Sequence, residues 1–137
     1  MESAWKLPWV SNRRLAQRVP VKLFCDEHLG DRPLRSVAFD MSECGLALRR
    51  LGRFGALPHE VVGLEFALPG TGEVIWAHAE TQFEAFERGV HRAGLRFVAM
   101  ARSHERLLHD YLMDRRLRAL QLAPPSLRDR LRALLQR

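Results

Sequence analysis

The ten residues VVGLEFALPG at positions 61–70 alternate between apolar side chains and other side chains. Val62, Leu64 and Phe66 fall on one side of an extended chain, because successive side chains of a strand point to opposite faces. The pair Pro69-Gly70 then supplies a turn signal. This stretch therefore predicts a β-strand with one buried face.

Similar short runs, separated by turn signals such as Gly30-Asp31-Arg32-Pro33, lie on both sides of this strand. Strands with a turn after about ten residues are typical of antiparallel all-β folds. The chain is therefore expected to be mainly β, either a barrel or a sandwich, and a βαβ fold is excluded. The six predicted strands are 19–25, 34–39, 45–50, 61–68, 73–87 and 90–100.

The pattern changes to helical spacing after Ser103, which we predict to be a helix N-cap with Glu105 in the first turn. Apolar residues then recur at helical intervals as far as Leu122. Pro124-Pro125 is expected to end this helix, and Ser126 to cap a second one. The predicted organisation is a flexible Arg-rich leader at 1–18, a barrel at 19–101 and a helical extension at 102–137.

The chain has 137 residues, 47% hydrophobic and 28% charged, and a net charge of +6. These values fit one folded domain and exclude a disordered chain or a large multidomain enzyme. Of the 22 basic residues 20 are Arg, and residues 102–137 hold nine basic and four acidic side chains. An excess of arginine suggests an anionic partner.

The arginines of the predicted helices are interpreted as a solvated face rather than as a nucleic-acid patch. Arg115, Arg116 and Arg118 alternate with Asp110 and Asp114, which suits pairing at the helix surface. The leucines of the second helix have little barrel left to cover. They are expected to contact a partner, for which a second copy of this chain is one candidate.

Several chemistries lack their sequence signals. No apolar run approaches the length of a membrane span, and no apolar signal core occupies the N-terminus, so we expect a cytoplasmic protein. Cys25 and Cys44 are interpreted as reduced thiols, and the six histidines lack metal-ligand spacing. No nucleophile, base and oxyanion site can be assembled. We therefore expect neither an enzyme nor a metal site nor a cofactor.

Two short motifs carry most of the functional information. The first is Arg14-Leu-Ala-Gln-Arg18, an RxxxR pattern that is common by chance in a chain so rich in arginine. The second is Asp40-Met-Ser42-Glu-Cys-Gly45, a [DN]xSxxG pattern that a chain of this length would contain by chance about once in twenty cases. A β-turn is the simplest explanation of the second motif. A ligand-binding loop needs a defined turn as well.

The order of these motifs resembles the PilZ domain, a bacterial receptor module for cyclic di-GMP. The resemblance covers about residues 13–112 and includes VPVKLF, DMSECGLAL, VGLEFALPG, EVIWAHAE and AGLRF, with a following helix. It implies a six-stranded antiparallel β-barrel followed by C-terminal α-helices. It also implies that cyclic di-GMP binds at the outer surface, between the leader and one strand edge.

The motif residues suit such a ligand. Arg14 and Arg18 can bind its phosphates or its guanines, since guanidinium groups donate paired hydrogen bonds. Asp40 can accept from guanine N1–H and N2–H, while Ser42 offers a hydroxyl and shapes the turn. Gly45 allows the ligand to approach the backbone closely.

Two further residues are candidates for ligand contact. Arg13 is adjacent to the RxxxR motif, and a solvated leader charge is an equal alternative for it. Trp76 lies in the strand where some PilZ domains stack an aromatic ring on a guanine. We favour packing of Trp76 in the core or at its rim, with ligand contact as the alternative.

Three hypotheses for the function follow. The first is a cyclic di-GMP effector that changes conformation on binding and regulates a partner protein. The second is a ligand-independent adaptor that acts through its helical tail, which could also support a homo-oligomer. The third, a small basic barrel for RNA or DNA, ranks last because residues 1–101 are almost neutral, with 13 basic and 12 acidic side chains.

Overall fold

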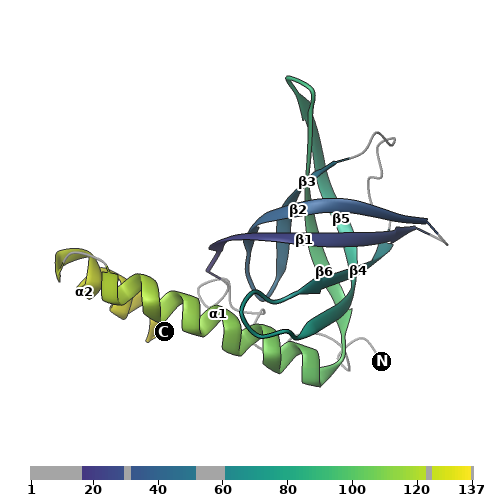
Figure 1. The fold of residues 1–137 in the computed structure, drawn as a ribbon. Coiled ribbons are helices and arrows are strands. Elements are labelled where there is room, and N and C mark those ends of the chain that lie inside the picture. The colour runs from purple at the N-terminus through teal and green to yellow at the C-terminus, as the bar shows by residue number, and fades with distance from the viewer. Residues whose placement is uncertain (1–16, 30–31, 52–60, 123–124, 137) are drawn as a thin grey trace.

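Across residues 17–29, 32–51, 61–122 and 125–136, which the computed structural model describes, six antiparallel strands form a closed barrel and two helices follow (Figure 1). The strands are β1 (Val19–Leu29), β2 (Arg32–Met41), β3 (Gly45–Arg50), β4 (Val61–Ala67), β5 (Val74–Glu87) and β6 (Val90–Met100). The helices are α1 (Arg102–Leu122) and α2 (Pro125–Leu135). The predicted fold class is confirmed.

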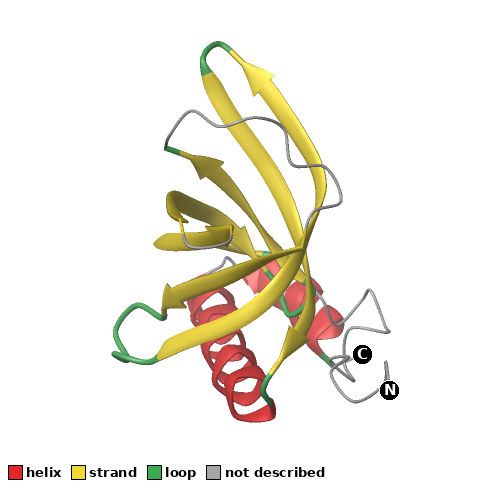
Figure 2. Ribbon diagram, turned by 90° about the vertical axis from the view of Figure 1, so that its right-hand side faces the viewer, coloured by secondary structure: helices red, strands yellow, loops and turns green. Residues whose placement is uncertain are grey.

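Pairing between the first and fourth strands makes the sheet a barrel rather than a sandwich. The order around the barrel is β1-β2-β3-β6-β5-β4, and β1 returns to pair with β4 through Cys25 opposite Phe66. A closed sheet has no free edge, so every strand finds backbone partners on both sides. The β5–β6 hairpin is the longest and rises above the rest of the barrel (Figures 1 and 2).

Strand alternation places the apolar side chains inside the barrel. On β3, Leu46 and Leu48 point inward and are fully buried, whereas Arg49, next to Leu48, points outward and is exposed. The decisive strand at 61–67 behaves as predicted, with Val62, Leu64 and Phe66 buried. These inward side chains meet those of the other strands in one continuous core.

The β1–β2 hairpin extends further than the sequence predicts. The polar run after Cys25 indicates a strand end, yet β1 continues to Leu29, which pairs with Arg32 at the start of β2. The pattern misleads because Glu27 points into the barrel, where Arg50 neutralises it. An inward carboxylate with a buried partner is compatible with the strand.

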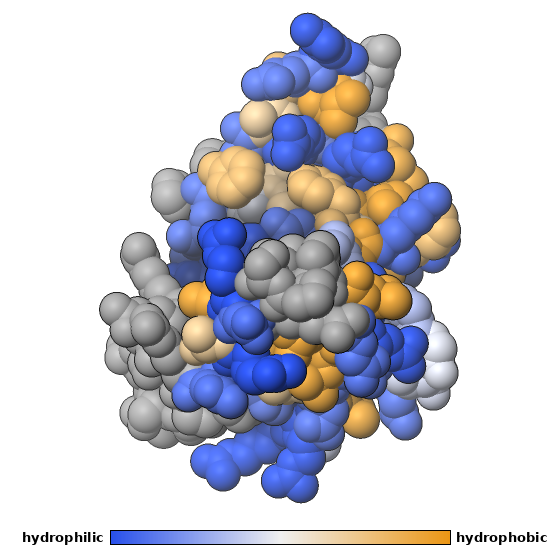
Figure 3. Space-filling model, turned by 90° about the vertical axis from the view of Figure 1, so that its left-hand side faces the viewer, coloured by the Kyte–Doolittle hydropathy of each residue, from blue (hydrophilic) through white to orange (hydrophobic). Residues whose placement is uncertain are grey.

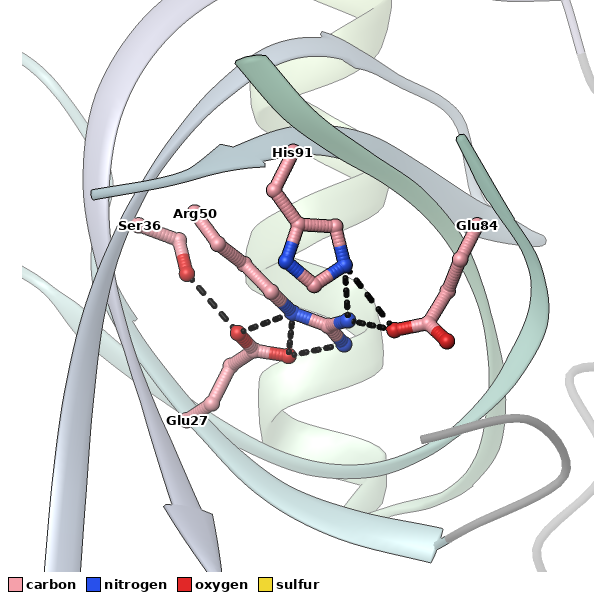
Figure 4. Close-up of polar contacts among 5 residues, drawn as sticks. All are labelled: Glu27, Ser36, Arg50, Glu84 and His91. Atoms are coloured by element: carbon pink, nitrogen blue, oxygen red, sulfur yellow. Dashed lines mark hydrogen bonds and ion pairs between the residues drawn. The ribbon is translucent and has the colours of Figure 1, made fainter. Parts of the chain in front are cut away.

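A polar cluster occupies the interior at the end of the barrel away from α1. Figure 4 shows it within the ring of strands. Arg50 donates to both carboxylate oxygens of Glu27 at 2.9 Å, and Ser36 Oγ donates to Glu27 at 2.8 Å. Arg50 also contacts Glu84, whose Oε1 lies 3.0 Å from His91 Nε2. Each buried charge thus has a partner, as burial of charge requires.

Helix α1 closes the opposite end of the barrel and lies beneath it (Figure 2). Leu108 and Leu112 are buried in the barrel core. The helix begins earlier than predicted: it starts at Arg102, and Glu105 N–H donates to the carbonyl of Ala101, so Ser103 is inside the first turn and is not the N-cap. No helix in the described part of the chain is long and apolar enough to cross a membrane.

Candidate ligand site

The structure brings Arg18 and the second motif together. β1 begins where β2 ends, and the register pairs Val19 with Met41 and Pro20 with Asp40. Arg18 Nη1 consequently lies 3.7 Å from Asp40 Oδ2, and both side chains are partly exposed. Arg13 and Arg14 lie outside the described residues.

Residues 40–45 form a tight connection between β2 and β3. Ser42 N–H donates to the carbonyl oxygen of Gly45 at 2.9 Å, and Ser42 Oγ accepts from Cys44 N–H at 3.1 Å. Ser42 is only 1% exposed. Its hydroxyl therefore shapes the turn, as the simpler interpretation of the motif expects.

Gly45 is required by a neighbouring strand. A Cβ at this position would lie 2.0 Å from the carbonyl oxygen of Leu95 on β6. No side chain fits there without a shift of the backbone. The close approach that the glycine allows is thus made by β6, at the start of β3.

Glu43, within the same motif, is the residue that sequence reasoning missed. Its carboxylate is 1% exposed and accepts two hydrogen bonds from Arg116 of α1, at 2.7 and 2.8 Å. His109 Nδ1 lies 2.9 Å from it. Burial raises the pKa of Glu43, but the hydrogen bonds and charge of Arg116, with the contact to His109, outweigh this and hold the pKa below its usual value.

Arg116 is therefore buried, and its predicted pairing at the helix surface is wrong. Besides Glu43, it donates to the backbone carbonyl of Gln17, the residue before Arg18. The neighbouring Arg118 does pair at the surface as predicted, with Asp114 at 3.0 Å. Helical spacing alone could not separate these two arginines, because the partners of Arg116 are 73 and 99 residues away in sequence.

A row of outward-facing positions crosses the barrel from the second motif. Asp40 pairs with Ala47 of β3, Ala47 with Gly94 of β6, and Gly94 with Phe83 of β5. We call these four residues the Asp40 row. Phe83 is 55% exposed, and its ring covers Gly94 so closely that a Cβ there would lie 2.1 Å from a ring carbon. The row joins a carboxylate to an exposed aromatic ring across two small residues.

A second cation flanks this row. Arg96 pairs in register with Gly45 on one side and with Glu80 on the other, and Arg96 Nη2 donates to Glu80 at 3.1 Å. Arg18 and Arg96 are both half exposed. Guanidinium donors, a carboxylate acceptor and an aromatic face together suit a planar ligand that carries phosphate.

Trp76 lies elsewhere. It is 49% exposed, pairs in register with Glu65 of β4, and stacks on His28 with ring centroids 5.3 Å apart. Its backbone N–H donates to His104 Nδ1 of α1. Seven residues of β5 separate it from Phe83, roughly 20 Å along an extended strand. The structure does not bring Trp76 to the Asp40 row, and Trp76 is half exposed and packs on His28 outside the core.

Phe83 could have been found from the hairpin. Counting outward from the Arg88-Gly89 turn pairs position 83 with Gly94. A glycine in a strand opposite an aromatic residue is a recognised arrangement, in which the ring covers the exposed backbone. Irregularities in the register between residues 78 and 83 hide the alternation of β5 itself.

The described residues contain no group of three or more His, Cys, Asp or Glu side chains that could hold a metal ion. Cys25 is buried in the core, and burial raises the pKa of its thiol to about 12. This thiol is therefore a packing group rather than a nucleophile.

The PilZ domain family model matches residues 12–114, three quarters of the chain. The chain belongs to the PilZ domain family. The match includes both sequence motifs, the whole barrel and the first half of α1. Among curated proteins no relative matches.

Solved structures share this PilZ fold. The Bacillus subtilis inhibitor of motility (MotI/DgrA) superposes with a TM-score of 0.69 at 18% identity, over 78% of this chain and 52% of that one. The PilZ domain of Escherichia coli YcgR with c-di-GMP gives 0.61 at 19% identity, over 80% and 96%.

A longer Escherichia coli YcgR, in complex with c-di-GMP, gives a TM-score of 0.65 at 21% identity, over 80% of this chain and 49% of that one. This PilZ chain thus spans about half the length of MotI and of the longer YcgR. At these identities the likeness establishes the fold.

Proposed function

We propose that this PilZ chain is a receptor for cyclic di-GMP, which binds at the Asp40 row. The observation that carries the proposal is the contact between Arg18 and Asp40, which joins the two sequence motifs at one place on the outer face. A PilZ domain of the same fold, from Escherichia coli YcgR, has been solved with c-di-GMP. The proposed activity is binding, without catalysis.

Each group has a role that follows from its chemistry. Asp40 accepts from N1–H and N2–H of one guanine, an edge that presents two donors side by side. Arg18, with Arg14 and Arg13 from the leader, donates to phosphate oxygens or to guanine O6 and N7. Phe83 supplies an aromatic face for a base, which stacking favours by about 1–3 kcal/mol. Ser42 and Gly45 keep the turn in shape.

Arg116 offers a route from this site to the helices. One guanidinium holds both Glu43, inside the second motif, and the carbonyl of Gln17, next to Arg18. Arg115 also donates to the carbonyl of Pro20 at 2.9 Å. If the leader moves when it binds a ligand, the hydrogen bonds from Arg116 and Arg115 to its end either break or displace α1. We propose that this is how binding reaches a partner protein.

The direct test is calorimetric titration with cyclic di-GMP. Wild type is expected to bind with micromolar affinity or better, and the Arg14→Ala/Arg18→Ala variant to lose that heat. The Arg130→Ala/Arg132→Ala variant is the matched control, because it removes two exposed arginines from α2. No heat from wild type at about 50 μM ligand would refute the proposal.

A second candidate function is a ligand-independent adaptor that acts through the helices. Leu117 and Leu122 of α1 are exposed, the latter at 87%. Single exposed leucines are ordinary on protein surfaces, so this support is weaker. A silent titration together with self-association in sedimentation that Leu117→Ser/Leu122→Ser abolishes would favour this candidate.

A further inference from the structure

A groove of about 650 Å³ lies on the outer face of β4, β5 and β6, beside the start of α1. Gly63 lines it and pairs in register with His28 on β1 and with His78 on β5. The half-exposed ring of Trp76, stacked on His28, stands beside this row. His104 of α1 contributes to the lining as well. We call this hollow the Trp76 groove.

The barrel itself does not require the glycine that keeps the groove open. A Cβ at Gly63 would meet, among the described residues, only His28 at 3.5 Å, which is an ordinary van der Waals contact. Gly45, by contrast, has no room for a Cβ. A glycine inside a strand weakens that strand and often marks a place where another group approaches closely. The groove therefore has the form of a contact surface whose occupant lies outside this chain's own fold.

The charge of this part of the barrel indicates what kind of occupant fits. Residues 61–87, which include β4 and β5, contain five glutamates and no lysine or arginine, although the chain carries a net charge of +6. Glu65 of this segment pairs in register with Trp76, at the side of the groove. A surface without cations does not attract phosphate. It is complementary to a basic partner that carries apolar side chains.

The helical tail of this chain has that complementary character. Residues 102–137 hold nine basic and four acidic side chains. Leu117 and Leu122 of α1 and Leu134 of α2 are exposed, and so are Arg118 and Arg130 near them. Figure 3, which faces the side of the molecule on which α2 lies, shows hydrophobic and hydrophilic side chains mixed over its lower, helical part. An amphipathic helix of this kind binds in a groove through its apolar side chains.

The tail cannot reach the groove of its own chain. Helix α1 begins beside the groove and has α2 at its other end (Figure 1). Its 21 residues span about 30 Å at 1.5 Å per residue. A second copy that lies antiparallel to the first places its tail at this groove and its own groove at the first tail. Such an arrangement is a closed two-fold dimer with two equal contacts.

We propose that the Trp76 groove binds the helical tail of a second copy of this chain, so that two copies form a reciprocal dimer. Tail leucines fill the space above Gly63 and pack on the ring of Trp76, while tail arginines face the glutamates of β4 and β5. Tryptophan is among the residue types that most often dominate the binding energy of an interface. The proposal is independent of the proposed function, because no small ligand takes part in this contact.

The test is sedimentation equilibrium at about 10–200 μM protein. Wild type is expected to dimerise. Gly63→Leu fills the groove, and Leu122→Ser/Leu134→Ser removes two apolar anchors of the tail. Each variant is expected to dimerise at least tenfold more weakly than wild type, because both of its contacts are damaged. Trp76→Ser is a second groove variant with the same expected loss. Leu51→Ser, which changes an exposed leucine outside groove and tail, should dimerise as wild type does.

An equimolar mixture of the Gly63→Leu and Leu122→Ser/Leu134→Ser variants is the decisive sample. The first variant keeps an intact tail and the second an intact groove, so a mixed pair retains one of the two contacts. The mixture should therefore dimerise more strongly than either variant alone. A wild type that stays monomeric at about 200 μM would overturn the proposal. So would a mixture that associates no better than its components, since groove and tail would then not be each other's partners.

Discussion

The Asp40 carboxylate is partly exposed, and among the described residues its only ion pair is a weak one with Arg18. Its contact with Arg18 joins two partly exposed groups, and such pairs contribute about 0–1 kcal/mol. A ligand can therefore open the pair at small cost and satisfy both charges. Ser42, two residues further on, is in the opposite situation, because its hydroxyl is buried and bonded within the turn.

This contrast predicts different effects for two alanine substitutions. Asp40→Ala should weaken cyclic di-GMP binding by tenfold or more and leave the thermal midpoint nearly unchanged. Ser42→Ala should cost about 1 kcal/mol of stability through the lost hydrogen bond, with a smaller effect on binding. Calorimetry and thermal denaturation of both variants measure this. Equal, small losses of affinity would mean that Asp40 serves the turn alone.

At the scale of elements, helix α1 uses one buried face for two purposes, at successive turns along its length. Leu108 and Leu112 close one end of the barrel, while Arg116 reaches from the same helix to the second motif. Arg116 binds the carboxylate of Glu43, which belongs to the turn between β2 and β3. The [DN]xSxxG pattern predicted this turn correctly. The long-range partner that stabilises this turn could be found only in the folded chain.

The Glu43–Arg116 pair predicts a dependence of stability on pH. Because the folded pKa of Glu43 lies below its ordinary value of 4.5, the pair stabilises the fold above that value. This contribution is lost as pH falls through the folded pKa, when the carboxylate takes up a proton. Thermal midpoints of wild type should therefore fall more steeply between about pH 6 and pH 3 than those of Glu43→Gln.

The control for this measurement is Asp114→Asn, which breaks an exposed pair with Arg118. It should follow the wild-type pH profile, because screened surface pairs contribute little. Parallel profiles for wild type and Glu43→Gln would contradict the assignment of the acid-sensitive contact to Glu43.

At the scale of the whole molecule, the barrel has an apolar end under α1 and a polar end around Arg50. In the polar cluster one guanidinium faces two buried carboxylates, Glu27 and Glu84. Removing the cation would leave both acids without their main partner in a low dielectric. Breaking a buried pair in this way costs about 3–5 kcal/mol.

Arg50→Met is accordingly expected to lower the free energy of unfolding by about 3–5 kcal/mol, measured by denaturant titration. Arg35→Met, which breaks the exposed pair with Asp26, is the matched control and should cost less than about 1 kcal/mol. A similar loss in both variants would show that the cluster is not a main source of stability.

Much of this fold could be predicted from local patterns. Strand alternation, turn signals and helical spacing located all the described elements to within a few residues, because each depends on neighbours in sequence. Two of the errors arose where a charged partner distant in sequence determined the environment of a residue. The polar run that contains Glu27 predicted a strand end, but Glu27 is buried against Arg50 within the strand. Arg116 was predicted at the helix surface, but it is buried against Glu43.

The sequence by itself determined the family, the mainly β architecture and the two motifs, since periodicity and motif spacing are local properties. Only the tertiary structure decided which side chains share a surface. The register of β1 with β2 placed Arg18 beside Asp40, the register of β5 with β6 put Phe83 and not Trp76 in the Asp40 row, and the register of β3 with β6 set Arg49 opposite Arg92. Such neighbours depend on strand register, and a shift of one residue would turn each side chain to the other face.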